Sequence, residues 1–516
     1  MFFVTWLFGG LLSLTEMRRR GTLAAKDMPP AIGVYYLISF VMALIFWLIL
    51  AGQILSLGGI VQANKITNLD QFAAYAGMLL TLADSIGNIL VLFYLFVFLI
   101  IVGMALSMLG EARTWFGKLA GDWGLIASAP IALALIIAIS ATNLNAIRAD
   151  TIYKQADPLR NAGQWDIGIA HYKRVLELAP DEDFYYLWLG AAYLEKAANA
   201  PATPDMLTSS STLEGVLGMN VVQTYQLNRK DSLQAAEVIL KHARDLNPLN
   251  TDHSANLARL YRRWADLSTD PAQRKANLDK ANEQYREATT LSPNNAVLWN
   301  EWATVAMSYA DLNRQTEDNA GADAHLQEAQ ARLDHSLEID NQYEPTQLYR
   351  AQLARFLGKS DEAVQAYQNA LKINPNSTDA VSGLLDLFSS TQNYTAAETV
   401  ATSFLTDHPD SLIALRTLAS NVYFPTNRIQ QALTTQQRVI QLSAKDANAW
   451  NDHRVFAIML FQIGQLPAAL QEAQTALSLA PQDQQPNVQS LVTEIQKQMN
   501  GGLVPTNTLP VTAPVP

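Results

Sequence analysis

The chain has 516 residues, which allows two or three domains, and it has no cysteine, which excludes disulfides, thiolate zinc sites and cysteine nucleophiles. Its formal net charge of −11 is unevenly spread: residues 1–142 hold seven basic and six acidic residues, whereas 143–516 hold 29 basic and 41 acidic residues. Because an acidic region repels phosphates, we expect no nucleic-acid partner.

Residues 1–142 are rich in apolar runs and predict a bundle of transmembrane helices. A helix needs about 20 apolar residues to cross a bilayer, where no water is available to bind the backbone. Three runs have this length, at about 34–58, 86–108 and 123–142. A shorter run at 1–14 predicts a short apolar helix, and residues 72–83 either extend the second span or lie in the interface.

The basic residues predict the orientation of this bundle. Four of them precede the first span and two lie between the second and third, whereas the loop between the first and second holds only Lys65. Because loops rich in Lys and Arg stay in the cytoplasm, the third span should leave it and place everything after Thr142 outside. The predicted location is therefore the cell membrane, with a multi-pass anchor, the lipid bilayer as a partner and an extracytoplasmic C-terminal region.

Asp84 is the one carboxylate close to a predicted span. One interpretation is a proton or ion site inside the membrane. The interpretation that we favour places Asp84 at the outer interface, because a full span fits after it.

Residues 149–483 carry a repeat of about 34 residues. Each unit is expected to form two helices, with small residues where the helices cross closely and a proline that often ends the unit. Residues 344–377 fit this spacing without adjustment, and 378–411 and 149–182 fit it as well. The unit that begins at Asp183 is interrupted, and its second helix is expected late. We expect about eight units in total.

This spacing resembles that of the tetratricopeptide repeat (TPR) family. Within 344–377 the resemblance rests on Ala351, Gly358, Ala363, Tyr367, Ala370 and Pro375. The resemblance implies an α-solenoid superhelix whose concave face, lined by the first helix of each unit, binds a peptide or protein. By this register the concave positions are Arg259, Arg262, Arg263, Asn300, Gln352, Arg355, Arg416 and Tyr423. The arginines could hold a carboxylate-bearing partner, or they are solvated or pair with acidic residues of adjacent helices.

Two segments follow the repeats. Residues 484–499 predict a capping helix, because the last unit of an array has no neighbour to cover its apolar face. Residues 500–516 are rich in Pro and Thr, carry no charge and are predicted to be disordered. The predicted fold class is all-α: an N-terminal transmembrane helix bundle followed by a TPR α-solenoid.

The order of the parts carries a second resemblance. Apolar runs that lead through 143–190 into repeats, together with 246–267, resemble the C-terminal part of bacterial O-antigen ligase- or polymerase-like membrane proteins with repeat tails. The resemblance implies glycan transfer from a lipid carrier, with a glycan or lipid-linked glycan as partner. In such enzymes a large outward loop bears catalytic His and Arg residues. The outward loop here is short and has neither, so no catalytic residue is carried over.

No catalytic, cofactor or metal motif is recognised elsewhere. None of the seven histidines forms an H-E-x-x-H pair, and the phosphate-binding GxxxxGK[ST] and GxGxxG patterns and the G-x-S-x-G elbow do not occur. The predicted function is a non-enzymatic, membrane-anchored scaffold that binds proteins. The alternative is a C-terminal fragment or subunit of a glycan transferase that lacks the catalytic loop.

Overall fold

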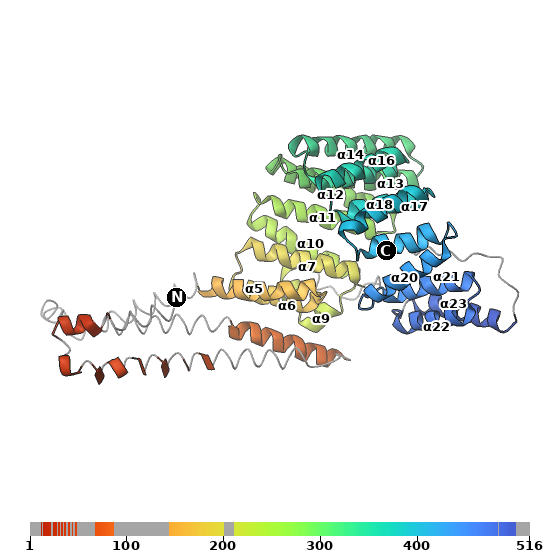
Figure 1. Ribbon diagram of the computed structural model, residues 1–516. Coiled ribbons are helices and arrows are strands. Elements are labelled where there is room, and N and C mark those ends of the chain that lie inside the picture. Colours follow the sequence, from red (N-terminus) through yellow and green to blue (C-terminus); the bar gives the residue numbers. More distant parts are fainter. Residues whose placement is uncertain are drawn as a thin grey trace. The chain divides into compact units, whose positions relative to one another are not determined.

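The computed structural model describes scattered residues between 12 and 48, then residues 68–86, 144–200, 211–482 and 484–501. These residues form helices and turns, with no strand among them, so the all-α part of the predicted fold is confirmed (Figure 1). The chain divides into two compact units, Met1–Trp264 and Ala265–Pro516.

The first unit contains a short 3₁₀ helix, a helix over 69–86, and then a series of helices joined by short turns. The elements with their bounds are η1 (Ala25–Asp27), α5 (Asn145–Asn161), α6 (Trp165–Leu178), α7 (Asp183–Asn199), α8 (Leu213–Gly218), α9 (Val221–Tyr225), α10 (Arg229–Leu246) and α11 (Thr251–Leu267), which runs across the boundary. The short helices α8 and α9 belong to a segment inserted between α7 and α10.

The second unit continues the same pattern of successive helices. Its elements are α12 (Pro271–Leu291), α13 (Ala296–Gln315), α14 (Asn319–Ile339), α15 (Glu344–Phe356), α16 (Ser360–Ile373), α17 (Thr378–Ser390), α18 (Tyr394–Asp407), α19 (Leu412–Arg416), η4 (Thr417–Tyr423), α20 (Ile429–Leu442), α21 (Ala449–Gln462), α22 (Leu466–Leu479) and α23 (Gln485–Met499). The segment η4 is a π-helical continuation of α19.

The predicted N-terminal transmembrane bundle is wrong. Among the residues that the structure describes, no helix has both the length and the apolarity needed to cross a bilayer. This finding overturns the membrane part of the predicted fold class and the predicted multi-pass location. Of the predicted spans, 123–142 lies outside the described residues, 86–108 is described only at Ile86, and 34–58 only at scattered positions up to 48. The predicted helix 1–14 and tail 500–516 also fall almost entirely outside them.

The helix over 69–86 contacts two helices of the first unit, α6 and α9. Arg174 Nε of α6 binds Asp84 Oδ1 of this helix at 3.0 Å, and the ring of Phe72 lies 4.8 Å from that of Tyr225 in α9. Asp84 therefore lies inside a helix and binds an arginine. Protein can cover apolar residues as well as lipid can, and composition does not distinguish the two.

Glycines let neighbouring helices approach closely at two crossings. A Cβ built on Gly190 of α7 would lie 2.5 Å from Leu240 Cγ of α10. In the second unit, a Cβ on Gly383 of α17 would lie 2.2 Å from the ring of Tyr367 in α16. Leu240 and Tyr367 are themselves buried, so neither can move aside freely.

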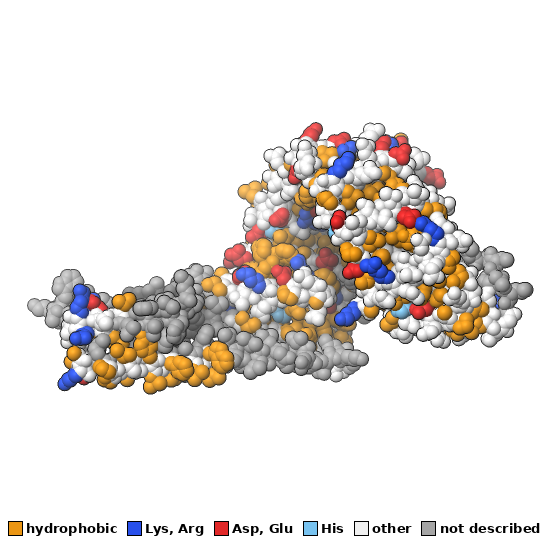
Figure 2. All heavy atoms as spheres, in the orientation of Figure 1, with side chains coloured by type: hydrophobic (Ala, Val, Ile, Leu, Met, Phe, Trp, Pro, Cys, Tyr) orange, Lys and Arg blue, Asp and Glu red, His pale blue; other side chains and the backbone are white. Residues whose placement is uncertain are grey.

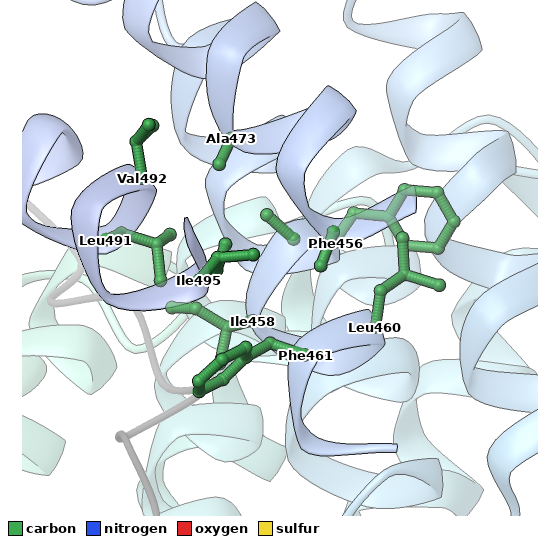
Figure 3. Close-up of a cluster of buried hydrophobic side chains, with 10 residues drawn as sticks. Phe456, Ile458, Leu460, Phe461, Ala473, Leu491, Val492 and Ile495 are labelled. Carbon is green, nitrogen blue, oxygen red and sulfur yellow. The ribbon is translucent and has the colours of Figure 1, made fainter. Parts of the chain in front are cut away.

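The last helix, α23, completes the core at the C-terminal end of the second unit. Its apolar side chains pack with those of α21 and α22 in one cluster, which contains Phe456, Ile458, Leu460, Phe461, Ala473, Leu491, Val492 and Ile495 (Figure 3). Because the opposite face of α23 is exposed at most positions, this helix covers the last pair without needing a further neighbour.

A carboxylate at the start of α7 binds the turn before the next helix pair. Asp183 Oδ2 accepts hydrogen bonds from the side-chain amides of Asn247 and Asn250, each at 3.1 Å, and lies 2.6 Å from His253 Nε2. The side chain of His253 is fully buried. This cluster fixes the spacing between α7 and the start of α11.

The same arrangement recurs in the second unit. Glu344, the first residue of α15, accepts hydrogen bonds from Asn374 Nδ2 at 2.8 Å and from Ser377 Oγ. Asn374 and Ser377 belong to the turn between α16 and α17. In both cases a carboxylate at the start of a first helix accepts hydrogen bonds from asparagine side chains of a turn, which would otherwise lose their contact with water without gaining a partner.

Replacing Gly190 with alanine should destabilise the chain. The added methyl group must displace Leu240, and such overpacking typically costs about 1–3 kcal/mol. The midpoint of urea denaturation, followed by circular dichroism of the full chain, measures the effect. Gly168→Ala in α6 is the matched control: its Cβ would meet only atoms at 3.8 Å or farther, and alanine is the better helix former. Equal midpoints for the two variants would contradict the crossing described here.

Replacing Asp183 with alanine should lower the free energy of unfolding by about 2 kcal/mol, because His253 and two amides lose their acceptor. Burial raises the pKa of Asp183, but the hydrogen bonds from Asn250, His253 and Asn247 outweigh it and leave that pKa below the ordinary value. The stabilisation is therefore present above the unfolded-state pKa near 3.9 and is lost as pH falls through the folded-state pKa.

Urea denaturation at a series of pH values tests this expectation. The difference between wild type and Asp183→Ala should stay constant from about pH 7 to about pH 4 and shrink below. Asp181→Ala, two residues earlier and exposed, is the control. If the difference in the free energy of unfolding between the two proteins already shrinks near neutral pH, a titratable group other than Asp183 causes the stabilisation.

Candidate functional site

The predicted partner-binding positions lie on first helices, at different depths. On α11, Arg259 and Arg262 are half-buried and already take part in interactions within the protein. Arg263, the next residue, is exposed. Of these three guanidinium groups, Arg263 is therefore the one presented most openly to a partner.

Gln352 and Arg355 form the accessible pair on α15. Both are exposed, and their spacing of three residues places them on one face of the helix. Arg355 pairs with Asp386 of α17, and both side chains remain open to solvent at 39% and 50% exposure. Hydrogen bonds to Tyr367 and to Asp386 raise the pKa of Arg355 above its ordinary value, so its charge is permanent.

Asn300 lies in the core, with 1% of its surface exposed. Its Nδ2 donates to Thr346 Oγ1 at 2.9 Å, and that oxygen lies 3.0 Å from Ser336 Oγ. Ser336 Oγ in turn donates to the carbonyl oxygen of Ala296 at 3.2 Å. The amide of Asn300 thus links α13, α14 and α15, and a partner at the surface does not reach it.

Arg416 makes a bidentate ion pair inside the second unit. Its Nε and Nη2 each lie 2.7 Å from a carboxylate oxygen of Asp452 in α21, which is 3% exposed, and Nη2 also lies 3.4 Å from Asp446. Hydrogen bonds to Asp452 raise the pKa of Arg416. Tyr423, in η4, lies under the guanidinium of Arg428 at 4.6 Å. Arg416 therefore pairs with acidic residues of the protein itself, which is the second of the two interpretations given above for the arginines.

The surface in view carries acidic and basic side chains interspersed over the repeat helices (Figure 2). Ion pairs also join neighbouring repeat elements, such as Arg274 with Asp311 at 2.6 Å and Arg428 with Glu398 at 2.7 Å. Within the described ranges, no group of three or more His, Asp or Glu residues is placed to hold a metal ion.

Sequence reasoning missed two buried lysines in the first unit. Lys173 Nζ donates to the carbonyl oxygen of Met219 at 3.0 Å, and burial lowers the pKa of Lys173 to about 7. Lys196 Nζ lies 2.8 Å from Asp166 Oδ1 and donates to the carbonyl oxygen of Tyr225 at 3.2 Å. Both ammonium groups hold carbonyls at the ends of α8 and α9, where a helix favours positive charge. They attach the inserted segment to α6 and α7.

Sequence reasoning also missed a cavity of about 750 Å³ in the second unit. It lies between the turn that precedes α13 and the turn that joins α14 to α15. Its lining comprises Ser292, Pro293, Asn294, Asn295, Ala296, Val297, Ile339, Asp340 and Tyr343. The turn compositions were visible in the sequence, but nothing there indicated that the two turns lie side by side.

Comparison with protein families identifies one repeat. The profile described as tetratricopeptide repeat matches residues 350–377. The match contains α16 and most of α15, and it includes Gln352 and Arg355. No curated protein matches the chain.

Solved structures similar to this chain include TPR proteins. One is a thermophilic TPR protein of Thermus thermophilus, with 18% identity and a TM-score of 0.34 over 46% of this chain and 99% of its own. Another is a tetratricopeptide repeat protein of Parabacteroides merdae, with 19% identity and a TM-score of 0.34 over 52% of this chain and 93% of its own. The resemblance to O-antigen ligase-like proteins has no support among these matches. Residues 350–377 thus match the tetratricopeptide repeat profile, and they lie within an all-α series of helices.

Proposed function

We propose that this chain is a scaffold whose first helices bind a peptide or protein partner. The observation that carries the proposal is the TPR match at 350–377, with Gln352 and Arg355 exposed on the first helix of that repeat. Exposed side chains on a rigid helix pair offer a preformed surface, so binding does not require the surface itself to be ordered first.

The exposed arginines favour a partner that carries carboxylates. A guanidinium presents a planar set of donors that matches a carboxylate with two parallel hydrogen bonds. Arg263 and Arg355 are the exposed arginines of the predicted set, one in each unit. At Arg355 the partner must share the guanidinium with Asp386, which lowers the gain expected there.

We do not propose the glycan-transferase alternative, nor the lipid and glycan partners that went with it. It needs catalytic His and Arg residues in an outward loop, and no residue of this chain could be matched to them. Because Asn300 is buried and Arg416 pairs with Asp452, neither belongs to the proposed binding surface.

A peptide selection should identify the partner chemistry. Full-length chain is immobilised and screened against a display library of random dodecapeptides, and the enriched peptides are then titrated by fluorescence anisotropy. We expect enrichment of Asp and Glu, and a loss of affinity of about tenfold, or 1.4 kcal/mol, for Arg355→Glu. Arg263→Glu should weaken those peptides that contact α11 by a similar factor.

Lys372→Glu is the matched control, because it makes the same charge change on the second helix of the same repeat, α16, where Lys372 is exposed. Its affinity should stay within about twofold of wild type. Two results oppose the proposal: the selection yields no binder, or the enriched peptides bind both Arg→Glu variants as tightly as the wild type.

Arg416 is expected to act in stability. Removing it by Arg416→Ala leaves the buried carboxylate of Asp452 without its main partner, which should cost about 2 kcal/mol, since the guanidinium is one-third exposed and partly screened by water. Arg263→Ala, an exposed change, should stay within about 0.5 kcal/mol. Urea denaturation compares the two, and equal midpoints would return Arg416 to the set of candidate binding residues.

A further inference from the structure

The cavity beside α13 is lined by apolar and polar groups in similar proportion. Pro293, Val297 and Ile339 contribute an apolar wall, and Tyr343 contributes an aromatic ring. Asn294 and Asp340 are exposed at the rim. Pockets that hold ligands commonly have volumes of about 300–1,000 Å³. This cavity has a volume of about 750 Å³, and it is a shallow hollow that is largely open to solvent.

The charge of this cavity is negative. Of the nine lining residues, none is Lys or Arg, and Asp340 is the one ionised side chain. Asp340 Oδ1 accepts a hydrogen bond from the backbone N–H of Gln342 at 2.9 Å, while Oδ2 has no hydrogen bond among the described residues. Asp340 Oδ2 can therefore accept a hydrogen bond from a bound partner, and no lysine or arginine among the lining residues competes for it.

Two carboxylates also act on the hydroxyl of Tyr343. Burial is the main cause that raises the pKa of Tyr343, and Tyr349, Glu301 and Asp340 raise it further by smaller amounts. A negative potential that opposes ionisation of the phenol also attracts a cation to the same place.

We propose that this cavity binds a basic peptide segment of a protein partner, with an arginine side chain between the Tyr343 ring and the free oxygen of Asp340. This inference rests on the proposed scaffold function and adds a second surface, which lies at the turns and selects the opposite partner charge. The occupant follows from charge complementarity, because a carboxylate and an aromatic face together favour a guanidinium.

The remaining features fit the same occupant. The apolar wall accommodates the methylene stem of arginine, which keeps its charged end at the polar rim. The amide of Asn294 can serve the backbone of an extended peptide. Residues 143–516 carry 29 basic and 41 acidic residues, so long-range attraction also favours the approach of a basic partner.

The test uses full-length chain and a fluorescein-labelled nonapeptide of alternating arginine and leucine, titrated by fluorescence anisotropy at low salt. Matched peptides replace arginine with glutamine or with glutamate. We expect the arginine peptide to bind and the glutamine peptide to bind at least about fivefold more weakly. The unlabelled glutamate peptide should not displace the labelled arginine peptide. Asp340→Asn should weaken the arginine peptide about tenfold, and Tyr343→Ala about threefold.

Asp340→Asn retains an oxygen that can accept the hydrogen bond from Gln342, so the turn should still form. Asp323→Asn on α14 is the control, because Asp323 is also exposed in the second unit and makes the same change in net charge. The proposal is overturned if the arginine peptide does not bind, if the glutamine peptide binds equally well, or if Asp323→Asn weakens binding as much as Asp340→Asn.

The two proposals fail separately. Arg355→Glu, which opposes acidic partners on α15, should leave the affinity for the arginine peptide unchanged within about twofold. If acidic peptides bind α15 but Asp340→Asn does not change the affinity for the arginine peptide, the cavity assignment is wrong and the scaffold function stands. If the arginine peptide responds to Asp340→Asn while no acidic binder is selected, the surface on α15 is wrong and the cavity stands.

Discussion

In the described part of the second unit, a helix pair leaves an apolar stripe that the next helix in the series covers, and the rest of that unit depends on this constraint. In the second unit, Ala303 of α13 and Leu333 of α14 share one buried cluster with Leu353 of α15. The series ends at α23, whose buried residues come from one side only. Stability is therefore built by stacking, and each pair is positioned by its neighbour.

Polar contacts between helices and turns fix the distances between neighbouring helix pairs more closely than apolar packing alone does. Asp183 and Glu344 each stand at the start of a first helix and bind the turn before the next pair. Arg416, the last residue of α19, instead pairs with Asp452 inside α21. The side chains in these links are of the same types that bind partners. A charged residue on a first helix can therefore serve an internal contact and not a binding surface.

Two kinds of surface result from this architecture. The faces of first helices present arginines such as Arg263 and Arg355, suited to carboxylates. The turns bring together residues from different pairs, and in the second unit they form a cavity with Asp340 and Tyr343 at hand, suited to a cation. A scaffold with both surfaces can hold partners of opposite charge without one displacing the other.

The sequence by itself determined the helical class and the TPR repeat around 344–377, because small residues at fixed offsets are a local property of one helix pair. The predicted transmembrane bundle was wrong, because no helix among the described residues combines the length and the apolarity that crossing a bilayer requires. The burial of Asn300, the pairing of Arg416 and the cavity at the turns were decided only by the tertiary structure. Each of these three features depends on which residues from different helix pairs become neighbours. The stacking of the pairs decides this, and the local sequence pattern does not.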